Sequence, residues 1–259
     1  MSPSPAMVFR ALVRRDVHVV SRELPMFLLR TTLQPIMFTF VFGYLLPKMG
    51  FVQPGYTGAV LPGILGVSLA FASVQAVALP MVADFGWTLE IEDRLLAPVP
   101  TWVIAVEKVV AGTVQGVIAA LFVLPVARLI MGPIAGLDFA HFGVVAGMTL
   151  LGAFTFSAFG LVLGTAIRGE QIGLMFGLIV APMIFFGCAY YPWKALAGTP
   201  VVQVLVLVNP LVYVSEGMRG ALTPTLPHMN PAVVAAALVL LSTLFLAVGL
   251  RTFDRRAVS

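Results

Sequence analysis

Long apolar runs recur along the chain and decide what it can fold into. A helix of roughly 18 or more apolar residues with few charges is long enough to cross the hydrocarbon layer of a bilayer, and this sequence contains several such runs. Of its 259 residues, 60% are hydrophobic and only 10% are charged, whereas about 25% of the residues in a soluble domain are charged. The sequence therefore predicts a single all-α, polytopic membrane domain over residues 1–259.

Hydropathy predicts six transmembrane spans, at Phe27–Leu46, Thr57–Val82, Val109–Met131, Val144–Ile167, Ile172–Cys188 and Pro231–Leu250. Six crossings place both termini on one side of the membrane. Eleven basic residues then fall on that side, namely Arg10, Arg14, Arg15, Arg22, Arg30, Arg94, Lys108, Arg168, Arg251, Arg255 and Arg256. The other side carries only Lys48, Arg128, Lys194 and Arg219. Because Lys and Arg concentrate in cytoplasmic loops, we expect both termini in the cytoplasm.

Residues 6–26, before the first span, have the pattern of an amphipathic helix lying in the membrane interface. Apolar residues recur at helical spacing, and a second, polar stripe four residues apart consists of Arg10, Arg14, His18 and Arg22, with Arg15 next to it in the sequence. Two interpretations remain open. The basic face contacts anionic lipid or a cytoplasmic partner, or it is a simple anchor on the cytoplasmic side.

The predicted cytoplasmic loop at 84–108 holds seven of the 26 charged residues of the chain. A short helix at 90–97, ended by Pro98, would present Leu95 and Leu96 beside charged groups. Such a segment suits docking into a groove of a partner, although an ordinary solvated loop has the same composition. We expect no metal or acid/base site at Glu90, Glu92 and Asp93, because they come from one loop without a nearby histidine.

The segment 189–230 is too apolar for a plain loop and contains too many prolines for a straight span. It predicts short re-entrant or interfacial helices on the outer side, with Tyr190 and Tyr191 at the membrane interface. Asn209 and Pro210 read as the N-cap and first residue of a helix. This helix would carry Tyr213 and would bring Glu216 and Arg219 together at i, i+3. At membrane depth such a pair either fixes the hairpin or contacts a substrate.

Several classes of function are excluded by what the sequence lacks. No lysine follows a glycine, so the chain has no P-loop for ATP. The single cysteine, Cys188, rules out a disulfide framework, and the scattered histidines predict no metal site. The net charge of +4 is spread over membrane-flanking positions, which argues against a nucleic-acid partner. We expect no cofactor bound to this chain.

Three motifs in order carry a family resemblance. They resemble segments of ABC-2 type transporter permeases and read EDRLLAPVPTWVIAVEKVVAG, FFGCAYYPWKAL and NPLVYVSEGMRGAL. The resemblance is to the group of drug and polysaccharide exporters, which includes daunorubicin-type and nodulation-factor-type permeases. The charged run before Arg94 is shorter than is usual in that family. The resemblance covers essentially the whole plan of the chain, while the motifs occupy about a fifth of it.

The resemblance implies a membrane subunit in the cytoplasmic membrane of a prokaryote, working as a dimer of permeases, expected to be a homodimer, with two ATPase subunits that hold ATP and Mg²⁺. It implies that residues 6–26 form the connecting helix and that residues 189–230 form an outer gate. The segment that contacts the ATPase would be Glu92, Asp93, Arg94, Leu95, Leu96, Ala97 and Pro98.

The expected mechanism is alternating access, and the apolar spans suggest an amphipathic or lipid-linked cargo. Phe154, Phe156 and Phe159 would line the pathway or simply pack. Gly160 and Gly164 allow close helix approach within or between permeases. The alternatives are an ATP-independent secondary transporter, which would need ionisable groups inside the spans, and a membrane scaffold. An intramembrane enzyme is not expected, because no nucleophile or metal cluster is present.

Overall fold

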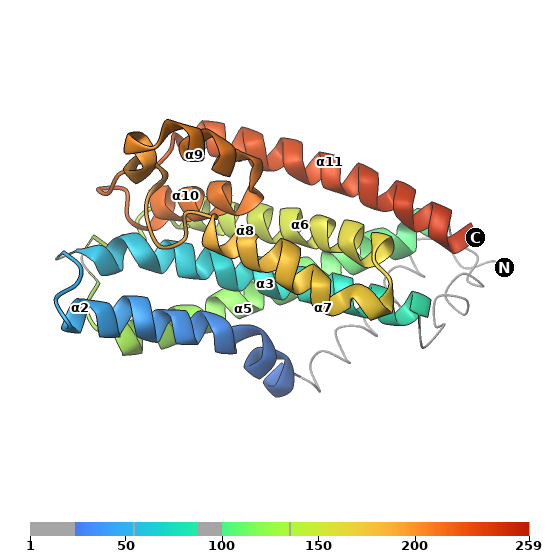
Figure 1. Cartoon of the computed structure of the whole chain (residues 1–259), viewed down its shortest axis with the longest axis horizontal. Helices are drawn as coiled ribbons and strands as arrows, with labels where there is room; N and C mark the ends of the chain where they lie inside the picture. Colours follow the sequence, from blue (N-terminus) through green and yellow to red (C-terminus); the bar gives the residue numbers. More distant parts are fainter. Residues whose placement is uncertain (1–23, 54, 87–99, 135, 259) are drawn as a thin grey trace.

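The structure is a computed structural model and describes residues 24–53, 55–86, 100–134 and 136–258. All regular elements within these ranges are helical, as predicted. Five helices are long and apolar enough to cross a membrane: Leu24–Lys48, α3 (Tyr56–Gly86), α5 (Thr101–Met131), α6 (Phe142–Ala166) and Pro231–Ala257 within α11 (Pro231–Val258). The first of these includes the π-helical turn η1 (Thr39–Leu45) and the short α2 (Leu46–Lys48). These helices form an elongated bundle (Figure 1).

Helix α3 is the centre of the bundle. Most of its length is buried, and it packs on both α5 and α6. Small residues allow this close approach: a Cβ added to Gly164 of α6 would lie 2.7 Å from the Cβ of Met81 and 3.0 Å from the Cα of Ala78, both on α3. Gly160 likewise faces Val74 of α3. The spacing of Gly160 and Gly164 therefore serves helix contact within one chain.

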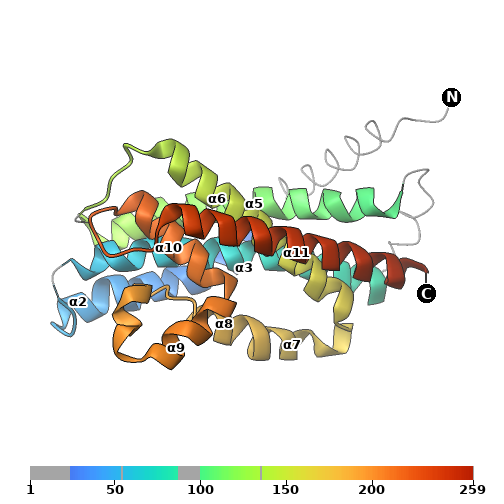
Figure 2. The same ribbon diagram turned by 90° about the horizontal axis from the view of Figure 1, so that it is seen from above.

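The predicted fifth span is the shortest. A run of short helices replaces a regular span: η2 (Gly169–Gln171), α7 (Ile172–Met175), the π-helical η3 (Phe176–Val180) and α8 (Ala181–Phe185). The apolar run Gly169–Phe185 ends before Cys188 and is shorter than the five long helices. It lies along one side of the bundle and leads toward α9 and α10 (Figure 2).

Two long helices extend beyond the predicted spans. Helix α5 begins at Thr101 rather than Val109, and α11 continues to Val258 rather than Leu250. The apolar windows stop at charged residues, such as Glu107 and Lys108 in α5 and Arg251 in α11, but both helices continue through them. Glu107 and Lys108 are buried in the bundle, whereas Arg251 is exposed. Hydropathy locates apolar segments and not helix ends.

The segment after Cys188 is broken into short helices, as predicted. These are η4 (Trp193–Gly198), α9 (Pro200–Leu205), η5 (Val206–Val208) and α10 (Pro210–Leu222). The stretch Pro200–Val208 meets α10 at an angle of 99°. This bent pair lies at one end of the bundle, and the C-terminus of α11 lies at the other (Figure 1).

Candidate functional site: a buried ion pair in the bent segment

Helix α10 begins as the sequence predicts, with Asn209 as its N-cap. The Asn209 Oδ1 accepts a hydrogen bond of 2.9 Å from the backbone N–H of Leu211, and Pro210 occupies the first helical position. The Asn209 Nδ2 also donates to the carbonyl oxygen of Met183 in α8, at 2.7 Å. One side chain therefore caps α10 and ties it to the preceding apolar run.

The short helices before α10 are held by their own polar contacts. The Trp193 indole donates to the carbonyl oxygen of Gln203 at 3.0 Å, and the Gln203 amide donates back to the carbonyl oxygen of Trp193 at 3.4 Å. The Tyr213 hydroxyl, on α10, donates to the carbonyl oxygen of Leu207 at 2.8 Å. The first two bonds join η4 to α9, and the third joins η5 to α10.

Glu216 and Arg219 form the predicted i, i+3 ion pair, between Glu216 Oε1 and Arg219 Nη1, and both side chains are completely buried. A buried charge is costly unless it is paired and its remaining hydrogen-bonding positions are satisfied. The bonds made by each partner therefore decide whether this pair is stable.

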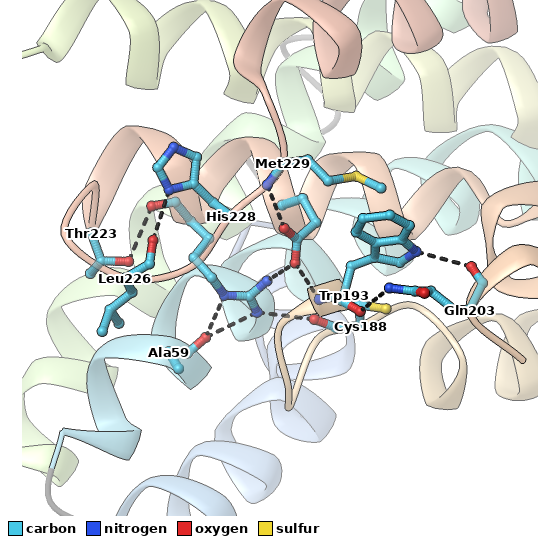
Figure 3. A network of polar contacts seen from close by, with 10 residues as sticks. Ala59, Cys188, Trp193, Gln203, Thr223, Leu226, His228 and Met229 are labelled. Carbon is cyan, nitrogen blue, oxygen red and sulfur yellow. Dashed lines mark hydrogen bonds and ion pairs between the residues drawn. The ribbon is translucent and has the colours of Figure 1, made fainter. Parts of the chain in front are cut away.

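Arg219 donates to two backbone carbonyls from other segments (Figure 3). Its Nε and Nη2 donate to the carbonyl oxygen of Ala59 in α3, at 3.1 and 3.0 Å. Nη2 also donates to the carbonyl oxygen of Cys188 at 3.0 Å. Cys188 has a φ of 51°, the single positive value at a non-glycine residue in the described ranges. The loop thus adopts an uncommon backbone conformation at the residue whose carbonyl meets the guanidinium.

Glu216 accepts hydrogen bonds from two further segments. Its Oε1 accepts from the backbone N–H of Trp193, and its Oε2 accepts from the backbone N–H of Met229, both at 2.8 Å (Figure 3). The pair therefore joins five places in the chain: the start of α3, the loop at Cys188, the start of η4, α10 itself and the loop that enters α11. We call these contacts the Glu216–Arg219 network.

Close backbone contact accompanies this network. A Cβ at Gly63 of α3 would collide with the carbonyl group of Ala189. The loop after α8 therefore lies directly on the backbone of α3, one turn from Ala59. Because α3 meets the loop without an intervening side chain, the guanidinium of Arg219 reaches both.

The two predicted interfacial tyrosines differ in position. Tyr191 is partly buried, whereas Tyr190 is buried and stacks on Phe42 of the first apolar helix, with 4.4 Å between ring centroids. Phe38 contacts the same ring edge-on at 5.4 Å. Tyr190 thus joins the first helix to the loop and does not lie at the surface.

The three phenylalanines of α6 are in unequal positions. Phe156 is completely buried in the core of a single chain. Phe159 is partly buried and contacts Phe245 of α11, with 5.0 Å between centroids, and Phe154 is partly buried beside the second core cluster. The sequence left two roles open for Phe156, lining the pathway or packing. Its buried position favours packing.

The predicted ATPase-contacting residues Glu92, Asp93, Arg94, Leu95, Leu96, Ala97 and Pro98 lie outside the described residues, as do Arg10, Arg14 and Arg15 of the predicted connecting helix. The described ranges contain no group of three or more His, Cys, Asp or Glu side chains arranged to hold a metal ion.

Sequence reasoning found the charged pair but not its partners. These partners take part through backbone atoms, which every residue type has, so the sequence does not mark them. They are Ala59, Cys188, Trp193 and Met229. The sequence could have predicted only that such partners exist, because a glutamate and an arginine in an apolar segment need hydrogen bonds beyond their own pair.

The sequence profile of the ABC-2 type transporter family matches residues 7–223. No curated protein sequence matches the chain significantly. The family match includes the spans from the first to the bent pair and ends just after α10, so it contains both charged residues of the network. Because it covers most of the chain, the chain belongs to the ABC-2 type transporter family and is an integral membrane permease component of an ABC transporter.

Proposed function

We propose that this chain is the membrane subunit of an ATP-driven exporter, that two copies form a homodimer, and that two separate ATPase subunits hold ATP and Mg²⁺ at the cytoplasmic face. Both termini would be cytoplasmic, in the cytoplasmic membrane of a prokaryote. Family membership supports the association with an ABC ATPase, and it argues against an ATP-independent secondary transporter or a scaffold.

The observation that carries this proposal is that α3 runs from the Glu216–Arg219 network to the start of the segment that joins it to α5, where the predicted ATPase-contacting residues lie in the sequence. Arg219 binds Ala59 in the first turn of α3, and the same helix continues without interruption to Gly86. Its 31 residues correspond to about 46 Å of helix. A force applied to the segment between α3 and α5 would therefore reach the outer segment along one continuous helix.

The network makes the outer segment and α3 one mechanical unit. Breaking any of its bonds would leave a buried charge or a buried backbone group without a partner, which is unfavourable. We therefore place the movement of alternating access between the two copies, where no such network is broken, and not within one chain.

The proposed cargo is amphipathic, lipid-linked or a polysaccharide. The apolar character of the helices supports such a cargo, because a pathway between two of these bundles would be lined largely by apolar side chains. Phe154 and Phe159 remain candidates for its wall, since both are partly exposed in the single chain.

The test is assembly and ATPase activity with the ABC ATPase encoded beside this permease. The Leu95→Asp/Leu96→Asp double variant should lose the co-purified ATPase, or keep it with activity uncoupled from the permease. The Leu95→Met/Leu96→Met variant keeps both positions apolar and should behave like the natural chain. If no ATPase associates with the natural chain, or if the aspartates have no effect, the proposed coupling is wrong.

A further inference from the structure

A second polar site lies at the end of the bundle opposite the Glu216–Arg219 network, where α11 finishes (Figure 1). It is a pocket of about 360 Å³ lined by Thr165, Ala166, Arg168, Thr252, Arg255 and Arg256. Three of its six lining residues are arginines, and the lining includes no carboxylate from the described residues. The proposed transport mechanism does not use these side chains.

The floor of the pocket is fixed by contacts between α6 and α11. The hydroxyl oxygens of Thr165 and Thr252 are 2.6 Å apart. Arg256 Nη1 donates to the carbonyl oxygens of Gly164, Thr165 and Ile167, at 3.2, 3.0 and 3.0 Å, which caps the C-terminal end of α6. The Arg256 guanidinium also lies over the Phe85 ring, 4.8 Å from its centroid.

The other two guanidinium groups are available to a ligand. Arg168 and Arg255 are exposed, and within the described ranges neither side chain makes a hydrogen bond or an ion pair. The neighbouring carboxylate, Asp254, accepts a hydrogen bond from the Thr101 hydroxyl of α5 instead. Arg168 and Arg255 bring like charges to the same pocket, and an anion held between them would reduce their mutual repulsion.

We propose that this pocket binds a phosphate group, namely that of an anionic phospholipid. The planar guanidinium group matches the oxygens of a phosphate in bidentate geometry. The pocket lies where the apolar sequence of α6 ends at Ala166 and where the apolar run of α11 gives way to Arg251 and the residues that follow. Residues at such a boundary meet the lipid headgroups, and basic pockets between transmembrane helices suit anionic headgroups.

The test compares lipid retention by the full chain purified in neutral detergent. Phosphatidylglycerol and phosphatidylcholine are titrated separately, and bound lipid is counted by native mass spectrometry. The Arg168→Gln/Arg255→Gln variant should bind phosphatidylglycerol at least about tenfold more weakly than the natural chain. The matched control, Arg128→Gln/Arg251→Gln, also removes two exposed arginines, neither of which lines the pocket, and should stay within about twofold.

A second arm separates the sources of the phosphate. Thermal stabilisation by phosphatidylglycerol but not by inorganic phosphate, lost in the pocket variant, assigns the pocket to lipid. Stabilisation by inorganic phosphate that is lost in the same variant supports the phosphate site and assigns it to a soluble phosphate compound.

Three results would overturn the proposal: equal retention of the two lipids, equal loss in both variants, or unchanged phosphatidylglycerol binding in the pocket variant. If a variant with unchanged lipid binding also fails to assemble with the ATPase, the arginines contact an acidic protein surface instead. Since the binding assay uses the permease alone, its outcome is independent of whether the exporter proposal holds.

Discussion

At the scale of single residues, Glu216 and Arg219 explain how the apolar segment at 189–230 keeps one conformation. Each side chain is fully buried, and together they form hydrogen bonds to four backbone groups from outside α10. Isolated charges in such a place would be strongly unfavourable, and the network removes this penalty only while all of its segments stay together. The ion pair therefore also holds these segments in one conformation.

Replacing Arg219 with alanine should destabilise the purified chain by about 3–5 kcal/mol, because Glu216 would remain buried without its cation. Thermal unfolding in detergent measures the loss. Glu216→Ala should have a similar effect, and the double variant should lose less than the sum of the two single losses.

The control for this prediction is Arg128→Ala, an exposed arginine at the end of α5, which should change stability by no more than about 0.5 kcal/mol. An Arg219→Ala chain as stable as this control would show that the network does not hold the segment.

Cys188 should resist thiol reagents in the folded chain. Its side chain is completely buried, and burial, with the negative charge of Glu216 nearby, raises the pKa of the thiol to about 12. The thiolate is the reactive form, so labelling by a maleimide should be very slow at neutral pH and should rise only as the pH approaches that value or as the chain unfolds.

A Val208→Cys variant provides the comparison, because Val208 is 80% exposed in the same outer segment. Its new thiol should react rapidly while Cys188 stays protected, which mass spectrometry of the labelled peptides distinguishes. Equal labelling of the two positions in folded protein at neutral pH would contradict the buried position of Cys188.

The sequence predicts this site only in part, for a physical reason. The Asn209 cap and the Glu216–Arg219 pair are local, so spacing along one helix is enough to predict them. The bonds to Ala59 and Cys188 depend on how segments far apart in the sequence meet, and backbone carbonyls occur at every residue. The family match contains the charged pair but does not identify these partners.

At the scale of elements, small residues and caps position the helices. Helix α6 lies directly on α3 where Gly160 and Gly164 face it, and α10 starts at a side chain that also bonds to α8. Hydropathy predicts the long helices well because a bilayer requires length and apolarity. It does not predict the 99° bend before α10 or the early start of α5, which depend on tertiary contacts.

Gly164→Ala should destabilise the chain by about 1–3 kcal/mol, because the added methyl group would overlap Met81 and press on α3. The matched control is Gly147→Ala in the same helix, where a Cβ would meet nothing within 4 Å. Thermal unfolding should separate the two variants, and equal stability would show that α6 and α3 are not closely packed at Gly164.

Asn209→Asp separates the two roles of that side chain. The carboxylate can still accept from the Leu211 N–H, but it cannot donate to the Met183 carbonyl, so we expect a loss of about 1–3 kcal/mol. Asn230 caps α11 by accepting from the Ala232 N–H at 2.9 Å, and it is exposed. Asn230→Asp should therefore be nearly neutral in thermal unfolding. A neutral Asn209→Asp would mean that the link to α8 contributes nothing.

At the scale of the whole molecule, two polar sites lie at opposite ends of the bundle. One end holds the Glu216–Arg219 network, and the other holds the C-terminal arginines and the ends of α3 and α6 (Figures 1 and 2). The central helix α3 connects them. In the proposed exporter, ATP-driven movement of the segment between α3 and α5 would pass along α3, and the two copies would rock as rigid bodies.

The most direct test is the distance between the outer segments of the two copies. Spin labels on Val208→Cys report it, since Cys188 should remain unlabelled. In the complex with the ATPase, trapping with ATP and vanadate should shift the distance distribution measured by pulsed electron paramagnetic resonance, and Leu95→Asp/Leu96→Asp should abolish the shift. An active ATPase complex whose distribution is the same with and without the trapped nucleotide would contradict ATP-driven alternating access by this permease.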